Sequence, residues 1–429
     1  MRRKKIHPAW KVLVCCCLIQ AGTLGAALCA SMFYTPVSQS LEIPLGTFTM
    51  YVTVQGILSV AASPVYGNLI QKISGKTLMT IAVVLYGVSW IVPALSQGMA
   101  LWYLIGVMRG VSIPMFFLFI PIVIQNWFEE KRGMALGIAT ACTGFSGAII
   151  NYGISWLMDF AGWRLASIFC GIFCLLASLF ALLFGVTMEP EKKGLLPYGS
   201  KSHAAEMISS KCTLTAKEIL HSRPFWLMAI MMGTFGVGSV ISQYMASYAL
   251  HLGGTLQMAG ACATAALLGN SIGKILLGFL NDRLGIKKGN GILMILAAAS
   301  FVLFLSGSRW IVLLCTASFA VGFYNSMISV SAPTLTRMCF WGENYSKIYS
   351  WLMACQSLAN AVSVSLLGRT VDYFESYRPV FFVGFVGGML CLFTYYLLFK
   401  EENYGTVTSK DRERSGRRIA GRQSDGQSV

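Results

Sequence analysis

Charged residues are scarce in this chain, and their scarcity excludes an ordinary soluble protein. Only 12% of the 429 residues are Asp, Glu, Lys or Arg, whereas 55% are hydrophobic. A soluble domain carries about twice that share of charge. The long apolar runs are therefore predicted to face lipid.

Several patterns of catalysis and metal binding are also missing. The 13 cysteines include no CxxC pair and no Cys/His metal spacing, and most lie in apolar runs, where cysteine behaves as a small hydrophobic residue. The complete Walker P-loop pattern does not occur, so the sequence gives no support for ATP hydrolysis. We expect no enzyme, no cofactor, no metal and no nucleic-acid partner.

Acidic residues and histidines are absent from the centres of the apolar runs. All 17 acidic residues lie in predicted loops or at the ends of predicted spans. Buried Asp, Glu and His side chains form the proton relays of many transporters. The sequence therefore predicts no such relay.

The apolar runs predict twelve membrane-spanning helices. They lie near 11–35, 47–70, 77–97, 101–125, 133–157, 164–187, 224–250, 256–280, 289–307, 310–333, 346–369 and 378–399. With a cytosolic N-terminus, 27 of the 33 basic residues fall inside, four fall outside and two lie within spans. Because Lys and Arg favour the cytosolic side, we predict a multi-pass cell-membrane protein with both termini cytosolic.

The chain is predicted to consist of two related halves. The segment Gly67–Lys76 matches Gly278–Lys287 at a constant offset of 211 residues. Repeated membrane halves are typical of transporters that bind substrate between the halves. We predict an all-α membrane protein with two pseudo-symmetric six-helix bundles. The predicted boundaries are 1–187 (N-terminal bundle), 188–223 (cytosolic linker), 224–399 (C-terminal bundle) and 400–429 (disordered basic tail).

The second copy of the repeated segment reads Gly278-Phe-Leu-Asn-Asp-Arg-Leu-Gly-Ile-Lys-Lys288 and resembles the cytosolic loop motif of the major facilitator superfamily. It lies between spans eight and nine, where that family carries the motif. Within the superfamily, the segment Asn126–Gly137 resembles a loop of oxalate/formate-antiporter-like and monocarboxylate-porter-like proteins. The resemblance covers about residues 10–400 and implies secondary transport by alternating access.

The resemblance also implies a conformational latch at the two loops. Asp282 is placed to face the positive N-terminal end of a neighbouring helix. Gln71 replaces this acid in the first copy, so the N-terminal latch is expected to be weaker. The predicted latch residues are Gly67, Gln71, Lys72, Lys76, Gly278, Asp282, Arg283, Gly285 and Lys287. The alternative is that these loops carry topogenic charge only.

Two cations lie within predicted spans, Arg109 in span four and Lys274 in span eight. Unpaired cations in a low-dielectric cavity require an anion, which the substrate would supply. Lys274 matches a substrate-contacting basic residue of the carboxylate-transporting subgroup, whereas the second basic residue, in span eleven, has no counterpart. The alternatives are a structural role for Arg109 on backbone carbonyls and snorkelling of Lys274 to the interface.

Uncharged polar residues in the spans would complete the site, or else serve as contacts between helices. The predicted substrate-binding residues are Arg109, Lys274, Gln20, Gln243, Asn270, Tyr324, Asn325 and Gln356.

The predicted function is transport of a small organic anion, a mono- or dicarboxylate, by a monomer embedded in membrane lipids. The lack of buried acids favours anion exchange or uniport, although the substrate itself could carry a proton. One alternative is an exporter of drugs or other metabolites with the same fold, which would need a buried acid. Another is a non-transporting membrane sensor whose basic tail binds a partner or lipid.

Overall fold

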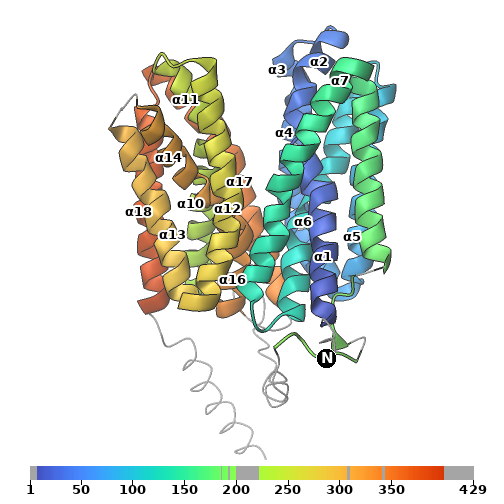
Figure 1. Cartoon of the computed structure of the whole chain (residues 1–429), viewed down its shortest axis with the longest axis vertical. Coiled ribbons are helices and arrows are strands. Elements are labelled where there is room, and N and C mark those ends of the chain that lie inside the picture. Colours follow the sequence, from blue (N-terminus) through green and yellow to red (C-terminus); the bar gives the residue numbers. More distant parts are fainter. Residues whose placement is uncertain are drawn as a thin grey trace, which may run out of the picture.

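The computed structural model describes residues 7–400 except 185, 192–193, 200–221, 307–309 and 341–343. The predicted tail lies outside these residues apart from Lys400, and so does most of the predicted linker. The described chain is almost entirely helical and forms two bundles side by side (Figure 1).

The N-terminal bundle contains the elements from α1 to α7. Pro8 stands at the first position of α1, where its missing N–H leaves no hydrogen bond unmade, and the His7 ring accepts a hydrogen bond from the Ala9 amide. The elements are α1 (Pro8–Gln20), η1 (Ala21–Gly25), η2 (Ala30–Phe33), α2 (Tyr34–Ser40), α3 (Leu45–Phe48), α4 (Met50–Lys72), α5 (Gly75–Ile91), η3 (Val92–Leu95), α6 (Met99–Trp127) and α7 (Arg132–Phe184).

The C-terminal bundle contains the elements from α10 to α18. Thr255 caps α12, and its hydroxyl accepts a hydrogen bond from the Met258 amide at 3.3 Å. The elements are α10 (Arg223–Gln243), α11 (Met245–His251), α12 (Leu256–Leu284), α13 (Ile286–Leu305), α14 (Ile311–Val321), α15 (Phe323–Ser326), η5 (Met327–Ser331), α16 (Ala332–Cys339), α17 (Tyr345–Phe374) and α18 (Arg378–Lys400).

Within the described residues, ten helical segments are long and apolar enough to cross a membrane. One of them, Arg132–Leu183, has 52 residues and crosses twice, because Gly162 adopts a left-handed φ of 79° and turns the chain back. The 23-residue helix α4 has the length of a span but is not among the ten. With α4 and both halves of α7, the twelve predicted crossings are present.

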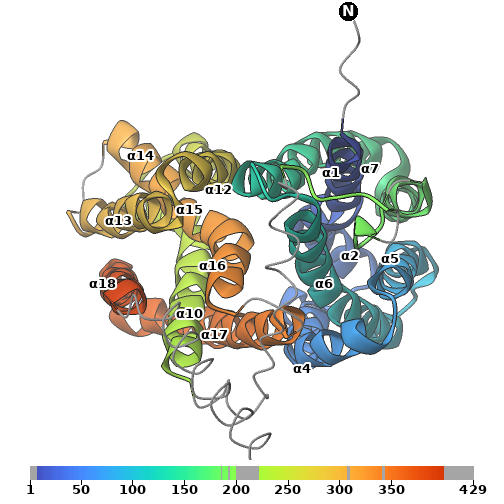
Figure 2. The same ribbon diagram turned by 90° about the horizontal axis from the view of Figure 1, so that it is seen from below.

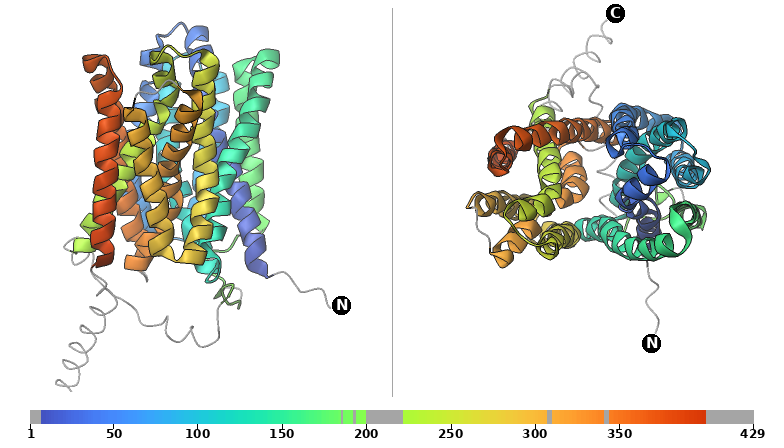
Figure 3. Two further views of the ribbon diagram at one scale, coloured as in Figure 1. Left: turned by 60° about the vertical axis from the view of Figure 1, so that its left-hand side comes forward. Right: turned by 90° about the horizontal axis from the view of Figure 1, so that it is seen from above.

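The two bundles approach each other at one end and diverge towards the other (Figure 1). We call the first the sealed end; Pro8, at the start of α1, and Lys400, at the end of α18, both lie there. Two helix pairs join the bundles, α7 with α12 and α4 with α17. Figures 2 and 3 show these pairs on opposite sides of the molecule.

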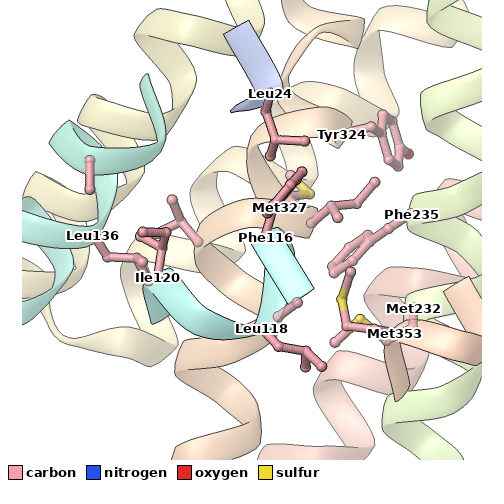
Figure 4. Packing of buried hydrophobic residues seen from close by; sticks show 14 of the residues in the cluster. Leu24, Phe116, Leu118, Ile120, Leu136, Met232, Phe235, Tyr324, Met327 and Met353 are labelled. Carbon is pink, nitrogen blue, oxygen red and sulfur yellow. The ribbon is translucent and has the colours of Figure 1, made fainter. Parts of the chain in front are cut away.

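The buried core runs through both bundles and across the contact between them. Figure 4 shows Leu24 and Phe116 of the N-terminal bundle near Met327 and Phe235 of the C-terminal bundle, all members of one cluster of buried hydrophobic residues. Burial of such side chains between the bundles stabilises their contact.

Three spans are irregular at the positions of predicted binding residues. In span one, Gln20 ends α1 and is followed by the π-helical turn η1. In span seven, α10 ends at Gln243. In span ten, Tyr324 and Asn325 lie in the short α15, directly before the π-helical turn η5. Such interruptions are frequent at functional sites, since they free backbone groups and reorient side chains.

Candidate functional site

The contact between α7 and α12 brings two backbones together over several turns. A Cβ atom on Gly278 would overlap the Gly133 carbonyl, and one on Gly137 would overlap the Lys274 carbonyl. Further from the sealed end, Gly144 packs against the Ser271 hydroxyl. Small residues permit this approach of two membrane helices. The predicted latch residue Gly278 thus lies where the backbones of the two bundles are in contact.

Asp282 caps the N-terminus of α7 across the bundle boundary. Its carboxylate accepts hydrogen bonds from the Gly133 amide at 2.9 Å and from the Met134 amide at 2.8 Å. These amides are among the first of the helix, which lack intrahelical acceptors, and the helix dipole favours a negative charge there. The charge-assisted contact therefore stabilises the sealed conformation.

Replacing Asp282 with Asn is expected to loosen this cap. The amide keeps one acceptor oxygen but loses the charge and the second acceptor, and because Asp282 is solvent-exposed we expect a loss of only about 1 kcal/mol. Hydrogen–deuterium exchange at the Gly133 and Met134 amides should become faster. The matched control is Asp159→Asn, an exposed acid of α7 at the other end of the molecule, away from the Gly133 and Met134 amides. Unchanged exchange in Asp282→Asn would contradict the capping role.

The other latch residues of the second copy surround this cap. The Arg283 guanidinium lies 4.6 Å from the centre of the Phe279 ring, and the Lys287 ammonium lies 5.4 Å from that of Phe399. Gly285 has a φ of 82°, a left-handed conformation that separates α12 from α13 and favours glycine. The motif thus combines a turn, a cap and basic side chains at one end.

The first copy of the repeated segment, Gly67–Lys76, lies beside α17, just as the second copy lies beside α7. Gly67 packs against Ser350 and the backbone of Lys347, near the start of α17. Gln71 and Lys72 are exposed at the end of α4, and Lys76 is half-buried in the first turn of α5. The two glycines of the repeat therefore make equivalent interbundle contacts. The role of all these residues in a transport cycle stays a prediction.

A polar pair at the sealed end lies close to the axis that relates the two halves. The Arg337 guanidinium donates to the Asn126 side-chain oxygen at 3.4 Å, and these residues are 211 positions apart. This is the offset of the repeated loop, so each residue faces its own counterpart. Beside them, the Gln125 amide donates to the Pro333 carbonyl and to the Tyr345 hydroxyl, both at 3.0 Å.

Lys274 lies between the bundles and is 5% exposed. Its ammonium donates to the Thr140 carbonyl of α7 at 3.2 Å and lies near the Cys142 thiol. Within the described residues it forms no salt bridge with a carboxylate. An ammonium has three donors, so an anion could use the others.

Gln20 belongs to the same neighbourhood as Lys274. The Thr143 hydroxyl donates to the Gln20 side-chain oxygen at 3.4 Å, and Cys17 is hydrogen-bonded to Cys142. The helices α1, α7 and α12 thus place these polar groups together at the bundle boundary. This polar group therefore includes two of the predicted binding residues, Lys274 and Gln20.

The remaining uncharged candidates lie mainly within the C-terminal bundle. Asn325 accepts from Ser239 at 2.7 Å and donates to Ser242 at 3.0 Å, which joins α15 to α10. Tyr324 is buried, with its ring 5.5 Å from that of Phe301.

Asn270, Gln356 and Gln243 occupy three different environments. The half-buried Asn270 has a side-chain oxygen without a hydrogen-bond partner in the described chain. Gln356 is 8% exposed and lies where α17 packs on α10, whereas Gln243 is exposed. These three side chains do not contact one another in the described chain, so this conformation does not gather all the candidates into one cluster.

Arg109 lies inside the N-terminal bundle, away from the boundary that contains Lys274. Its guanidinium donates to the Ser89 hydroxyl at 3.1 Å and to the Ser89 carbonyl at 3.4 Å, and lies 4.0 Å from the centre of the Trp90 ring. The structure therefore places the two intramembrane cations in separate surroundings. Substrate binding by either of them stays a prediction.

Several residues of the bundle boundary were not predicted from the sequence. Gln125, Tyr345 and Arg337 are among them, and the backbone carbonyl of Thr140 could not have been identified from residue type. Only the Asn126–Arg337 pair carried a signal, because the repeat offset of 211 relates its members. No group of three metal-binding side chains occurs in the part of the chain that the structure describes.

Sequence comparisons with known proteins find a matching family and several named relatives. The family model described as Major Facilitator Superfamily matches residues 14–260 and 241–424. The chain is similar to "Probable transporter MCH2" of Saccharomyces cerevisiae, with 24% identity over 403 residues that cover 89% of this chain and 81% of that protein. It is also similar to human "Monocarboxylate transporter 12", with 20% identity over 395 residues that cover 87% and 77%.

Solved structures show the same fold at low sequence identity. The transporter FucP in its outward conformation superposes with a TM-score of 0.68, at 14% identity, over 92% of this chain and 99% of that one. The proton:xylose symporter XylE gives a TM-score of 0.71, at 14% identity, over 91% and 95%. The superfamily resemblance of the loop motifs is thereby confirmed. The chain belongs to the major facilitator superfamily and is a multi-pass membrane transporter rather than an enzyme.

Proposed function

We propose that this transporter carries small organic anions, mono- or dicarboxylates, and that Lys274 binds the carboxylate. The observation that carries the proposal is the buried Lys274 ammonium at the bundle boundary, bonded to the Thr140 carbonyl and without a carboxylate partner among the described residues. A buried cation favours an anion, and alternating access requires a site that both bundles touch. Relatives named monocarboxylate transporters support this substrate class.

The binding step would exchange one partner of Lys274 for another. With substrate absent, the Thr140 carbonyl accepts one hydrogen bond from the ammonium. A carboxylate arriving at the Lys274 ammonium would compete for the same donors and form charge-assisted hydrogen bonds, which are stronger. Because α7 and α12 belong to different bundles, occupancy of Lys274 would be coupled to the contact between them.

The coupling mode follows from the distribution of acids. All 17 acidic residues lie outside the centres of the predicted spans, so a buried carboxylate relay for protons has no candidate. We therefore propose anion exchange or uniport. Proteoliposomes preloaded with unlabelled formate, oxalate, lactate or pyruvate test this, since exchange should accelerate uptake of the labelled anion. Absence of uptake for every carboxylate would contradict the proposed substrate class.

We further propose that the sealed end faces the cytosol of the cell membrane. The strong bias of Lys and Arg supports this orientation, because both Pro8 and Lys400 lie at the sealed end. The described conformation would then be open to the outside.

Labelling of introduced cysteines provides the test of orientation. In a background without reactive native cysteines, Glu42→Cys at the far end should react with a membrane-impermeant thiol reagent in intact cells. Thr77→Cys, at the start of α5, should react only after permeabilisation. Both positions are exposed, so accessibility does not depend on burial. The reverse labelling pattern would invert the proposed topology.

A further inference from the structure

A second group of polar side chains lies inside the N-terminal bundle, around Arg109. A small cavity, with about 10 Å³ of space for a water-sized ligand, is lined by Arg109, Phe33, Tyr51, Trp90, Trp102 and Ser167. These residues belong to η2, α4, α5, α6 and α7, all in the same bundle. This space suits a single water molecule or small ion and is far below the roughly 300–1,000 Å³ typical of pockets for organic ligands.

The charge of Arg109 is not balanced by an acid. The side chain is 3% exposed, no acidic residue lines the cavity, and no salt bridge to Arg109 occurs within the described residues. The titratable groups that its charge reaches are all Tyr and Cys side chains, which are neutral at pH 7. They are Tyr34, Tyr51, Tyr86, Cys170 and Cys174.

The ring of Trp90 compensates for only part of the missing anion. Its centre lies 4.0 Å from the guanidinium carbon of Arg109, and that of Tyr86 lies 6.0 Å away. A cation–π contact offsets only part of the cost of removing a charge from water. The buried charge of Arg109 is therefore only partly compensated, and a bound anion would compensate for the rest.

Donors without acceptors reach the same cavity. A guanidinium has five N–H groups, and the hydrogen bonds of Arg109 within the described residues all go to Ser89. Trp102 is 2% exposed, and its indole N–H has no partner in the described part of the chain. A ligand that only accepts hydrogen bonds and carries negative charge matches this lining. A water molecule would supply no charge and would need acceptors for its own protons.

We propose that this cavity binds a small inorganic anion of the size of chloride, separately from the substrate site at Lys274. The anion would accept hydrogen bonds from the Arg109 guanidinium and the Trp102 indole, and would neutralise the buried charge. Because the cavity is lined by residues of α4, α5, α6 and α7, a bound anion would hold these helices together and stabilise the N-terminal bundle.

Thermal unfolding of the purified full-length protein in detergent tests the proposal. At constant pH and ionic strength, chloride or bromide replaces gluconate, whose six-carbon chain does not fit the cavity. A saturable rise in Tm with chloride and with bromide is expected, because a ligand stabilises the folded state that binds it. Equal Tm values in chloride and gluconate at all concentrations would overturn the proposal.

Three variants locate the effect. Trp102→Phe keeps an aromatic ring but removes the indole N–H and part of the bicycle, so the chloride concentration at half-saturation should rise about tenfold. Arg109→Gln should abolish saturation, and Lys274→Gln should leave it unchanged. A wild-type response in Trp102→Phe would overturn the site, and this variant decides the matter if Arg109→Gln does not fold. Loss of the response in Lys274→Gln would show that the anion occupies the substrate site instead.

Discussion

Replacing Lys274 with glutamine is expected to reduce carboxylate uptake by two to three orders of magnitude. The substitution keeps a polar side chain of nearly the same reach but removes the charge that the substrate carboxylate would meet. Breaking a buried ion pair costs about 3–5 kcal/mol, and each 1.4 kcal/mol corresponds to about a tenfold change in affinity. Initial rates of labelled uptake in proteoliposomes, at several substrate concentrations, measure the effect.

Two control variants separate loss of the site from loss of a positive charge. Lys11→Gln removes an exposed Lys from α1, so it should transport like the wild type. Lys274→Arg keeps the charge in a larger planar group, so it should recover part of the uptake. If Lys274→Gln transports carboxylates like the wild type, with equal protein in the vesicles, Lys274 does not bind the substrate.

Replacing Gly278 with valine is expected to prevent closure of the sealed end. A Cβ at this position would overlap the Gly133 carbonyl, and backbone cannot move aside as the end of a flexible side chain can. Overpacking costs about 1–3 kcal/mol, which shifts the ratio of sealed to open forms by about 5- to 150-fold. Because each transport cycle must pass through the sealed form, uptake should fall by a similar factor.

A buried reporter distinguishes this mechanism from misfolding. Gln125 is 1% exposed at the bundle boundary, so a cysteine introduced there should be alkylated only when the sealed end opens. Alkylation should accelerate at least about fivefold with Gly278→Val. The matched control is Gly260→Val in the same helix, where a Cβ meets open space. Slow alkylation in Gly278→Val, equal to that in the control, would contradict the role of this glycine in closure.

Most of the fold could be predicted from the sequence because the membrane restricts the choice of structure. Lipid cannot satisfy backbone hydrogen bonds, so each apolar run of sufficient length must be helical. The repeat offset and the basic residues then indicate the pairing of the halves. Helix α4 was predicted as an apolar run over 47–70, although it is not among the ten most apolar segments, and the repeat copy at Gly67 indicates that it is the counterpart of α12.

The candidate site was harder to predict from the sequence, because it depends on the rotation of each helix and on backbone atoms. Arg109 and Lys274 are equivalent as residue types in apolar runs. Only the structure shows that Arg109 turns towards Ser89 within its own bundle, whereas Lys274 reaches the Thr140 carbonyl of the other. The π-helical turns at Ala21–Gly25 and Met327–Ser331 also change the helical phase beyond Gln20 and Asn325.

The domain boundaries stay a prediction for a related reason. The described residues include 188–191, 194–199 and 222–223 of the proposed linker. Its first part is bound to the N-terminal bundle, since the Tyr198 amide donates to the Trp127 carbonyl at 2.8 Å and the Asn126 side-chain amide donates to the Met188 carbonyl at 3.2 Å. These contacts involve backbone carbonyls, which residue identity does not reveal.

The contact between Asn126 and Arg337 limits how similar the two halves of this protein can become. A residue that faces its own repeat copy would face an identical side chain if the halves were the same. Two arginines there would repel each other, and two asparagines would leave the pair without a formal charge. The observed combination thus exists only in a chain whose halves have diverged at this position.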